Sequence, residues 1–418
     1  MNKRLAITLF LAVILFLGTV LTIFWAKGYR PSLKEKTIKG TGLLVANSHP
    51  KGASVYLNGK LTTATDDTLH LPPGEYQIKI VKDGFVSWEK TLQLESELVT
   101  QTNARLFPSV PDLTALTLTG AINPTPSPNG QKIVYAVSSA SASLKNGLWV
   151  SNLNDLPLNF GSNHLQIAQN TSNIDFAQAE IAWSPNSQQI LVSLPQGNHF
   201  LLPSDSFTKP SAIKDISATL PLVLDEWQQE LAINNQKRLE KLPLFMQQVA
   251  TTSAQQVYFS PDETKIVYLA TEELTIPKDL LPSLPASSTQ PEERLLQPGK
   301  VYVYDLKEDK NFLIKEMESP QDSEETSLSD IQKTLFSLTK QYSPLYTFLP
   351  QWLPTSRHLI FTEDNKINII EYDGENLTTV YIGDFKDDFV YPWPSGNKLI
   401  ILTSLNSPIP NLYSINLR

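Results

Sequence analysis

Few residues in this sequence could carry out chemistry, and those few are far apart. The 418 residues include no cysteine, which excludes disulfides, thiolate zinc sites and cysteine nucleophiles. The histidines fall in different segments: His49, His70, His164, His199 and His358. No nucleophile elbow, phosphate-binding loop, dinucleotide fingerprint, zinc-protease motif or calcium loop occurs. We therefore expect no catalytic residue, no cofactor and no metal site.

Two places remain at which a ligand could bind. His358 lies in a turn whose counterparts elsewhere in the chain carry Lys or Gln, so we expect a surface position rather than a ligand. Asp384, Asp387 and Asp388 are close enough in sequence to hold a hard cation. No further oxygen ligand has the spacing of a known loop, so we interpret these three as a solvated acidic turn.

The N-terminal segment has the length and composition of a membrane span. No charge occurs from Leu5 to Ala26, and these 22 residues rise roughly 33 Å as a helix, against a hydrocarbon core of about 30 Å. A cleaved signal peptide usually has an apolar region of about 7 to 15 residues that ends in small residues, whereas Phe24 and Trp25 are bulky. We predict an uncleaved transmembrane anchor and linker over residues 1–39. More Lys and Arg follow this helix than precede it, which alone favours a cytoplasmic bulk, although large domains are translocated against that bias.

Residues 40–107 show the alternation of half-buried strands. Apolar and polar residues alternate over 42–46, 53–57, 76–81 and 91–94, and Asn58-Gly59 can form a two-residue turn. The series Pro50-Lys51-Gly52-Ala53, Val55 to Lys60, Pro73-Gly74-Glu75-Tyr76 and Lys82 to Phe85 resembles the PEGA domain. Lys51 stands where that family has Glu, and residues 62–67 lack its Thr-Pro. The resemblance implies a small β-sandwich that serves as an accessory module of the cell surface or envelope, without catalytic residues.

From residue 108 onward one pattern occurs five times. A proline is followed five positions later by Ile or Leu that opens an apolar run, and the prolines are Pro128, Pro185, Pro261, Pro354 and Pro394. Aromatic residues stand one or two places before four of them: Trp183, Phe259, Trp352 and Trp393. Each copy predicts a strand, a tight turn and a second strand, and a third strand follows in each.

The copies that begin Trp183-Ser-Pro-Asn-Ser and Phe259-Ser-Pro-Asp-Glu resemble the TolB-like (WD40-like) β-propeller repeat. The resemblance implies a five-bladed β-propeller over residues 108–418, so the fold class is all-β: a sandwich and a propeller behind one N-terminal helix. Successive prolines are 57, 76, 93 and 40 residues apart, whereas a four-stranded blade takes about 40 to 45. We therefore expect insertions at 225–248, 271–299 and 316–343, with helices in the first and near 329–341.

The ring needs one more strand. The last copy supplies three strands, and the apolar segment Leu113–Leu118 has no partner of its own. An unpaired edge exposes backbone donors and acceptors, so we predict that this segment completes the last blade.

The tryptophans recur with the repeat, which predicts packing between blades rather than sugar binding. If every blade has four strands, the proline turns mark one face and all three insertions lie on the other. Long loops on one side of a rigid scaffold favour binding, which makes Trp227, Phe245, Leu280 and Leu284 candidates for a partner-binding face. The alternative is that these loops are tolerated surface insertions.

The expected function is that of a binding module. A net charge of −8 argues against nucleic-acid binding. Both resembled families act mostly outside the cytoplasm, so we expect a membrane-anchored, extracytoplasmic, non-catalytic scaffold of the cell envelope. Its partner is an envelope protein or a cell-surface polysaccharide. A propeller-containing envelope hydrolase and a membrane-tethered sensor subunit remain as alternatives, although no catalytic α/β domain is recognised and only residues 1–4 precede the helix.

Overall fold

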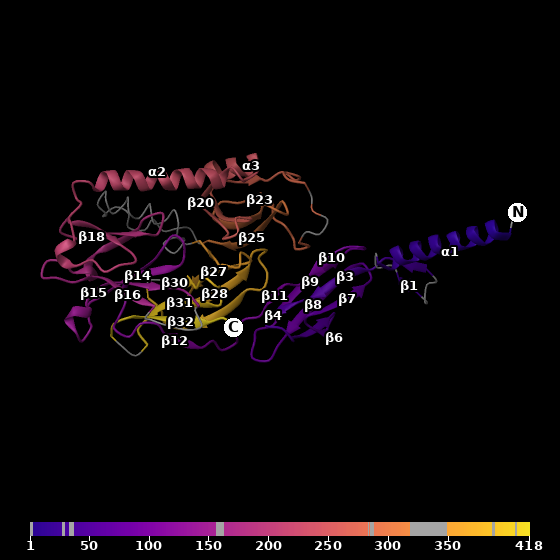
Figure 1. The fold of residues 1–418 in the computed structure, drawn as a ribbon, viewed down its shortest axis with the longest axis horizontal. Helices are drawn as coiled ribbons and strands as arrows, with labels where there is room; N and C mark the ends of the chain where they lie inside the picture. The colour runs from indigo at the N-terminus through magenta and orange to yellow at the C-terminus, as the bar shows by residue number, and fades with distance from the viewer. Residues whose placement is uncertain are drawn as a thin grey trace. The chain divides into compact units, whose positions relative to one another are not determined.

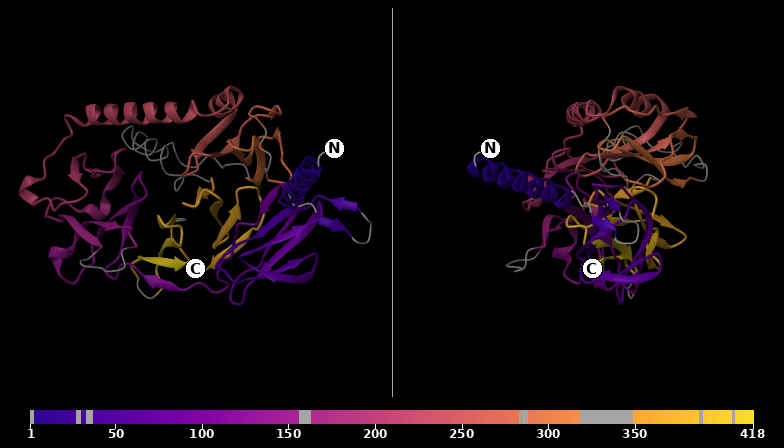
Figure 2. Two further views of the ribbon diagram at one scale, coloured as in Figure 1. Left: turned by 45° about the vertical axis from the view of Figure 1, so that its right-hand side comes forward. Right: turned by 90° about the vertical axis from the view of Figure 1, so that its right-hand side faces the viewer.

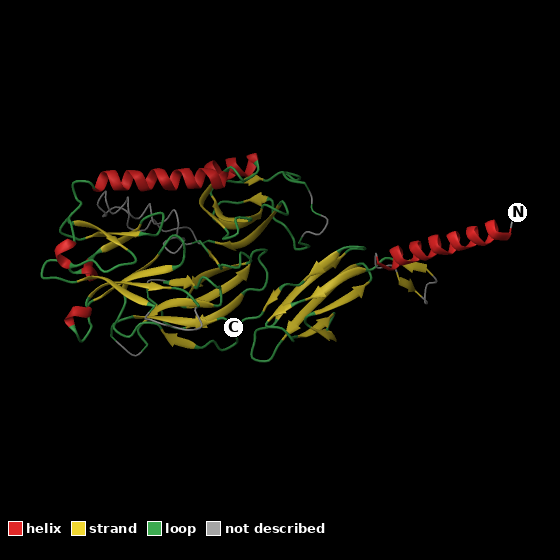
Figure 3. Ribbon diagram, viewed as in Figure 1, coloured by secondary structure: helices red, strands yellow, loops and turns green. Residues whose placement is uncertain are grey.

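The structure is a computed structural model that describes residues 3–26, 30–32, 37–155, 163–282, 284, 288–317, 349–386, 389–405 and 408–418 (Figures 1 and 3). The chain divides into two compact units. The first comprises Met1–Ser109 together with Ser283–Pro291, and the second comprises Val110–Pro282 and Glu292–Arg418. Part of the expected insertion at 271–299 therefore belongs to the first unit.

The first unit begins with helix α1 (Lys3–Ala26), followed by the hairpin β1 (Arg30–Ser32) and β2 (Thr37–Lys39). The apolar side chains in the middle of α1 are exposed, with Ile7 at 60% and Leu15 at 73%. Among the residues that the structure describes, no helix is both long and apolar enough to cross a membrane.

A small β-sandwich follows. One sheet has the order β10 (Val99–Gln101), β3 (Gly42–Ala46), β7 (Asp67–Leu71), and the other has the order β6 (Lys60–Ala64), β5 (Ser54–Leu57), β8 (Gly74–Val81), β9 (Trp88–Leu94). A short pair joins β4 (Ser48–His49) and β11 (Ala104–Arg105). Asn58 and Gly59, both at positive φ, form the predicted turn between β5 and β6. Alternate residues such as Leu44, Val55 and Ile80 are fully buried and form the core.

The described part of the second unit contains five antiparallel sheets of three or four strands and one separate two-stranded pair. The first sheet comprises β13 (Ile122–Pro126), β14 (Lys132–Val137), β15 (Gly147–Asn152) and β16 (His164–Gln169), and the second comprises β17 (Glu180–Trp183), β18 (Gln189–Ser193) and β19 (His199–Pro203). The third sheet comprises β20 (Ala254–Phe259), β21 (Lys265–Ala270), β24 (Lys300–Asp305) and β25 (Lys310–Glu316). The fourth comprises β26 (Gln351–Trp352), β27 (His358–Glu363), β28 (Lys366–Glu371) and β29 (Thr378–Ile382). Short elements lie between them: η1 (Ser143–Lys145), η2 (Phe176–Gln178), η3 (Pro210–Ala212) and the pair β22 (Leu274–Thr275) and β23 (Leu295–Leu296).

The fifth sheet joins distant parts of the chain. Its order is β12 (Leu113–Ala115), β32 (Asn411–Asn416), β31 (Lys398–Thr403), β30 (Val390–Pro392). Leu113 faces Ile415 in the register, and the Leu116 amide donates to the Leu412 carbonyl. The prediction that Leu113–Leu118 completes the last sheet is confirmed.

The repeated tryptophans join neighbouring sheets. The Trp183 indole Nε1 donates to the Thr125 carbonyl of the first sheet over 2.9 Å, and the Trp352 Nε1 donates to the Tyr258 carbonyl of the third sheet over 3.2 Å. Both rings are buried. The expected packing role is therefore confirmed for these two residues.

A helical insertion lies between the second and third sheets. Helix α2 (Leu220–Leu239) packs Leu224 and Trp227 against Leu191 of the second sheet. Helix α3 (Leu244–Gln248) and the π-helical turn η4 (Val249–Ser253) pack against the third sheet, around Tyr268 and Tyr302. Figures 1 and 2 show α2 reaching from the side of the second sheet to that of the third.

Candidate functional site

The five proline turns share one backbone geometry. The residue two positions after each proline has a left-handed φ: Gly130 (72°), Ser187 (61°), Glu263 (55°), Ser356 (58°) and Gly396 (69°). In each, that residue's amide donates to the carbonyl three positions earlier, as Gly130 does to Ser127. Proline presets φ at the second position of such a turn, and the left-handed residue lets the hairpin close.

These turns meet at a cavity of about 1250 Å³ in the second unit. Its described lining includes all five turn prolines, aromatic residues of the innermost strands and a set of amides: Pro128, Pro185, Pro261, Pro354, Pro394, Tyr258, Phe259, Trp352, Tyr391, Asn129, Asn234, Asn235, Gln131, Gln256 and Gln351. Such a lining combines apolar surface with donors and acceptors, which is typical of a binding site.

Helix α2 supplies Lys237 and Arg238 to the basic part of this lining, and Lys241 follows in the turn after the helix. Glu263, from the third proline turn, lies among them: the Arg238 Nε is 3.1 Å from the Glu263 Oε1, and Lys241 pairs with the Oε2. The hydrogen bond from Lys241, aided by the charge of Arg238, holds the pKa of Glu263 below its usual value. The described lining therefore contains three basic side chains and one carboxylate, so positive charge is in excess.

This arrangement corrects the prediction that all three insertions lie on the face opposite the proline turns. The second sheet has three strands, and the place of a fourth is reduced to one bridge between Phe200 and Asp215. The chain therefore leaves this sheet differently from a four-stranded one, and α2 lines the same cavity as the turns. The segment 316–343 falls almost wholly outside the described residues.

Hydroxyl groups link the turns of adjacent sheets. The Ser187 Oγ accepts from the Asn129 amide at 3.1 Å, and the Ser356 Oγ accepts from the Asp262 amide at 3.0 Å. The equivalent residue of the third sheet is Glu263, which reaches α2 instead. The ion pair thus replaces the turn-to-turn link where α2 separates two sheets.

The inner strand of the third sheet is distorted where it borders the cavity. Gln256 has a φ of 54° within β20, and the register with β21 shifts between Gln255 and Tyr258. Asn123 of β13, at the same position of the repeat, has a φ of 50° beside a similar shift. A bulge of this kind changes the direction of the side chains next to it, and Gln256 is one of the residues that line the cavity.

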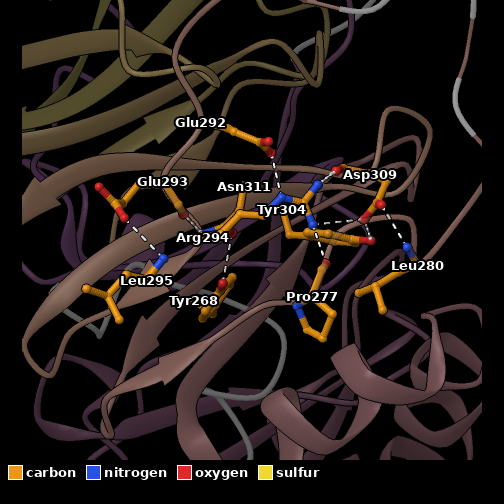
Figure 4. A network of polar contacts seen from close by, with 10 residues as sticks. All are labelled: Tyr268, Pro277, Leu280, Glu292, Glu293, Arg294, Leu295, Tyr304, Asp309 and Asn311. Atoms are coloured by element: carbon orange, nitrogen blue, oxygen red, sulfur yellow. Dashed lines mark hydrogen bonds and ion pairs between the residues drawn. The ribbon is translucent and has the colours of Figure 1, made fainter.

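The insertion at 271–299 is held to the third sheet by a buried polar network (Figure 4). Arg294 is paired with Glu292 at 2.7 Å and donates to the backbone carbonyl of Asp309. The Asp309 carboxylate accepts from the Tyr304 hydroxyl and the Leu280 amide, each at 2.8 Å. Both limbs of the insertion are therefore fixed at their base.

The predicted partner-binding residues do not form one exposed group. Trp227 is 6% exposed and lies in the core under α2, so it has no surface to offer a partner. Phe245 and Leu280 are half-buried against the third sheet. Leu284 is exposed, but it belongs to the first unit.

The predicted ligand positions differ in outcome. His358 is 4% exposed at the start of β27, so the expected surface position is wrong and the side chain is buried. Asp384 accepts a long hydrogen bond from Asn365, whereas Asp387 and Asp388 lie outside the described residues. Within the described ranges, no group of three or more His, Asp or Glu residues could hold a metal ion.

The fold thus combines a small β-sandwich with a unit that has the sheet order of a β-propeller. Residues 41–109 match the PEGA domain. A comparison with curated proteins finds no match.

Among solved structures, the chain is similar to TolB from Agrobacterium tumefaciens, with 14% identity over 69% of this chain and 70% of that one and a TM-score of 0.21. It is also similar to TolB from Acinetobacter baumannii, with 10% identity over 82% and 59% of the two chains and a TM-score of 0.18. The C-terminal WD40 domain of Sif2 is 9% identical over 91% and 97%, with a TM-score of 0.25.

Proposed function

We propose that this chain is a membrane-anchored, extracytoplasmic, non-catalytic binding or scaffolding protein of the cell envelope. In this proposal the five sheets are the blades of a five-bladed propeller, and the central cavity receives part of a partner. The uncharged run from Leu5 to Ala26 and the exposed apolar side chains of α1 support the anchor. The PEGA match supports a position outside the cytoplasm, against the Lys/Arg count.

The observation that carries the proposal is the chemistry of the cavity lining. Side-chain amides can satisfy the backbone of an extended polypeptide, and prolines and tyrosines offer apolar contact. The excess of basic residues favours a segment that bears a carboxylate. The Trp352 indole, the tryptophan of the described lining, is buried and bonded to Tyr258, so it offers a sugar no open stacking face. Of the two expected partner classes, we therefore propose an envelope protein.

The described polar groups of the cavity also favour binding over catalysis. Glu263 is held ionised by two cations, which makes it a weak general acid. The Ser127 and Ser260 hydroxyls donate to the Asn129 and Asp262 side chains within their own turns, so they serve turn geometry. Neither serine is hydrogen-bonded to a histidine, as an activated nucleophile would be.

The test is affinity capture from detergent-solubilised envelope with the soluble part of the chain from residue 40. Lys237→Glu should reduce capture of the partner several-fold, because it reverses a charge on the cavity wall. Lys307→Glu, an exposed lysine outside the lining, is the matched control. Equal capture by both variants would contradict the proposal that the cavity binds the partner.

The anchor and its orientation need a separate test. Protease added to intact cells or spheroplasts should digest the second unit, because residues 27–418 are proposed to lie outside. Full protection of that unit would overturn the orientation, and release of the chain from membranes by high salt would overturn the anchor.

A further inference from the structure

Strand β9 forms an edge of its sheet, whose order is β6-β5-β8-β9. Its side chains alternate between buried and exposed, and Thr91 and Gln93 are exposed. Backbone groups of successive residues in a strand point to opposite sides, so those of Thr91 and Gln93 point away from β8. A seven-residue edge without proline or bulge is a template for pairing with another chain.

This edge is occupied by side chains from the other piece of chain in the first unit. The Gln93 amide donates to the Thr289 Oγ1 over 3.2 Å, and the Gln290 Nε2 donates to the Thr91 carbonyl over 2.8 Å. Gln290 is only 7% exposed, which is unusual for a glutamine in a loop. The two side chains thus supply the acceptor and the donor that the backbone of a neighbouring strand would supply.

The opposite edge needs no such cover. Strand β6 begins at Lys60, and its register with β5 shifts between Val55 and Tyr56. A charged residue and an irregular register are ordinary protections of an edge strand. Strand β9 carries Glu89 and Lys90 in its first half, but it pairs with β8 without a shift, and its exposed positions Thr91 and Gln93 are uncharged. The 288–290 segment covers this second half of the edge.

We propose that residues 288–290 are an intramolecular cap for the edge of β9, so that this part of the 271–299 insertion completes the first unit and prevents its self-association. The sequence predicts that the 271–299 insertion presents Leu280 and Leu284 to a partner. In this proposal residues 288–290 of the insertion instead cover an edge strand of the same chain.

The test uses amide hydrogen exchange on the full chain in detergent. Thr289→Val keeps the side-chain shape but removes the acceptor, so exchange at the Gln93 amide should rise roughly 3- to 10-fold. The Leu92 amide, which faces β8, should not change and reports that the sheet remains folded. Thr62→Val, on exposed strand β6, is the matched control. An unchanged Gln93 rate in Thr289→Val would overturn the proposal.

A second measurement addresses self-association. The double variant Thr289→Val/Gln290→Met should form dimers or larger species as its concentration rises, whereas the parent chain and Thr62→Val should not, as measured by analytical ultracentrifugation. A double variant that keeps the parent's oligomeric state at all concentrations would overturn the protective role.

Discussion

At the scale of single residues, the hydrogen bond of a buried indole group can be tested by one substitution. Trp183→Phe keeps an aromatic ring, although a smaller one, and removes the donor to the Thr125 carbonyl, which then stays buried without that partner. We expect a loss of about 1 to 2 kcal/mol in the free energy of unfolding, measured by chemical denaturation. Trp149→Phe is the control, because its Nε1 bond to Lys145 is exposed to solvent and should be worth less. Equal losses would contradict a stabilising role of the buried hydrogen bond at Trp183.

Asp309 is the residue on which the network of Figure 4 depends. Asp309→Ala removes the acceptor of the Tyr304 hydroxyl and the Leu280 amide, and it leaves Arg294 with less compensation in a buried position. We expect a loss of about 2 to 4 kcal/mol in the free energy of unfolding. Glu273→Ala, at an exposed carboxylate of the same insertion, should change it little. Thermal unfolding of both variants checks this.

At the scale of elements, the link between α2 and the third sheet should depend on pH. The pKa of Glu263 is lowered from 4.5, so its stabilising effect is present above that value and disappears as the pH falls through the folded-state pKa. Its side chain is 30% exposed, which limits the effect to about 0.5 to 1 kcal/mol.

The measurement compares the free energy of unfolding at pH 7 and pH 3. Glu263→Gln should be less stable than the parent at pH 7 and similar to it at pH 3. Glu230→Gln, on helix α2, should follow the parent at both pH values. A difference that persists in acid would mean that the charge is not what links these elements.

Elements were also where prediction from sequence worked best and where it failed. The strands, the Asn58-Gly59 turn and the proline turns could be predicted because each has a local signal in spacing and turn residues. The convergence of α2 with the proline turns could not, because it depends on the second sheet having one strand fewer. The burial of His358 was missed because a turn-like sequence carries no signal for what packs above it.

At the scale of the whole molecule, we expect the fifth sheet to make the second unit unfold as one. A chain that starts at Gly120 lacks β12, which leaves β32 as an open edge. We expect its unfolding to lose cooperativity, seen as a broadened calorimetric transition at a lower temperature. A chain that starts at Val110 keeps β12 and is the control. Identical melting of the two would show that closure by β12 is unnecessary.

The same closure has a mechanical consequence. Strand β12 follows the first unit directly in the chain, and among the described strands its pairing with β32 is the only hydrogen-bonded strand pair that joins the beginning of the second unit to its C-terminal segment. Tension applied from the N-terminal side reaches the short β12–β32 register of Leu113 to Ala115 before any other pair of strands in that unit. We therefore expect a pull on the chain to separate β12 from β32 before it unfolds the other four sheets.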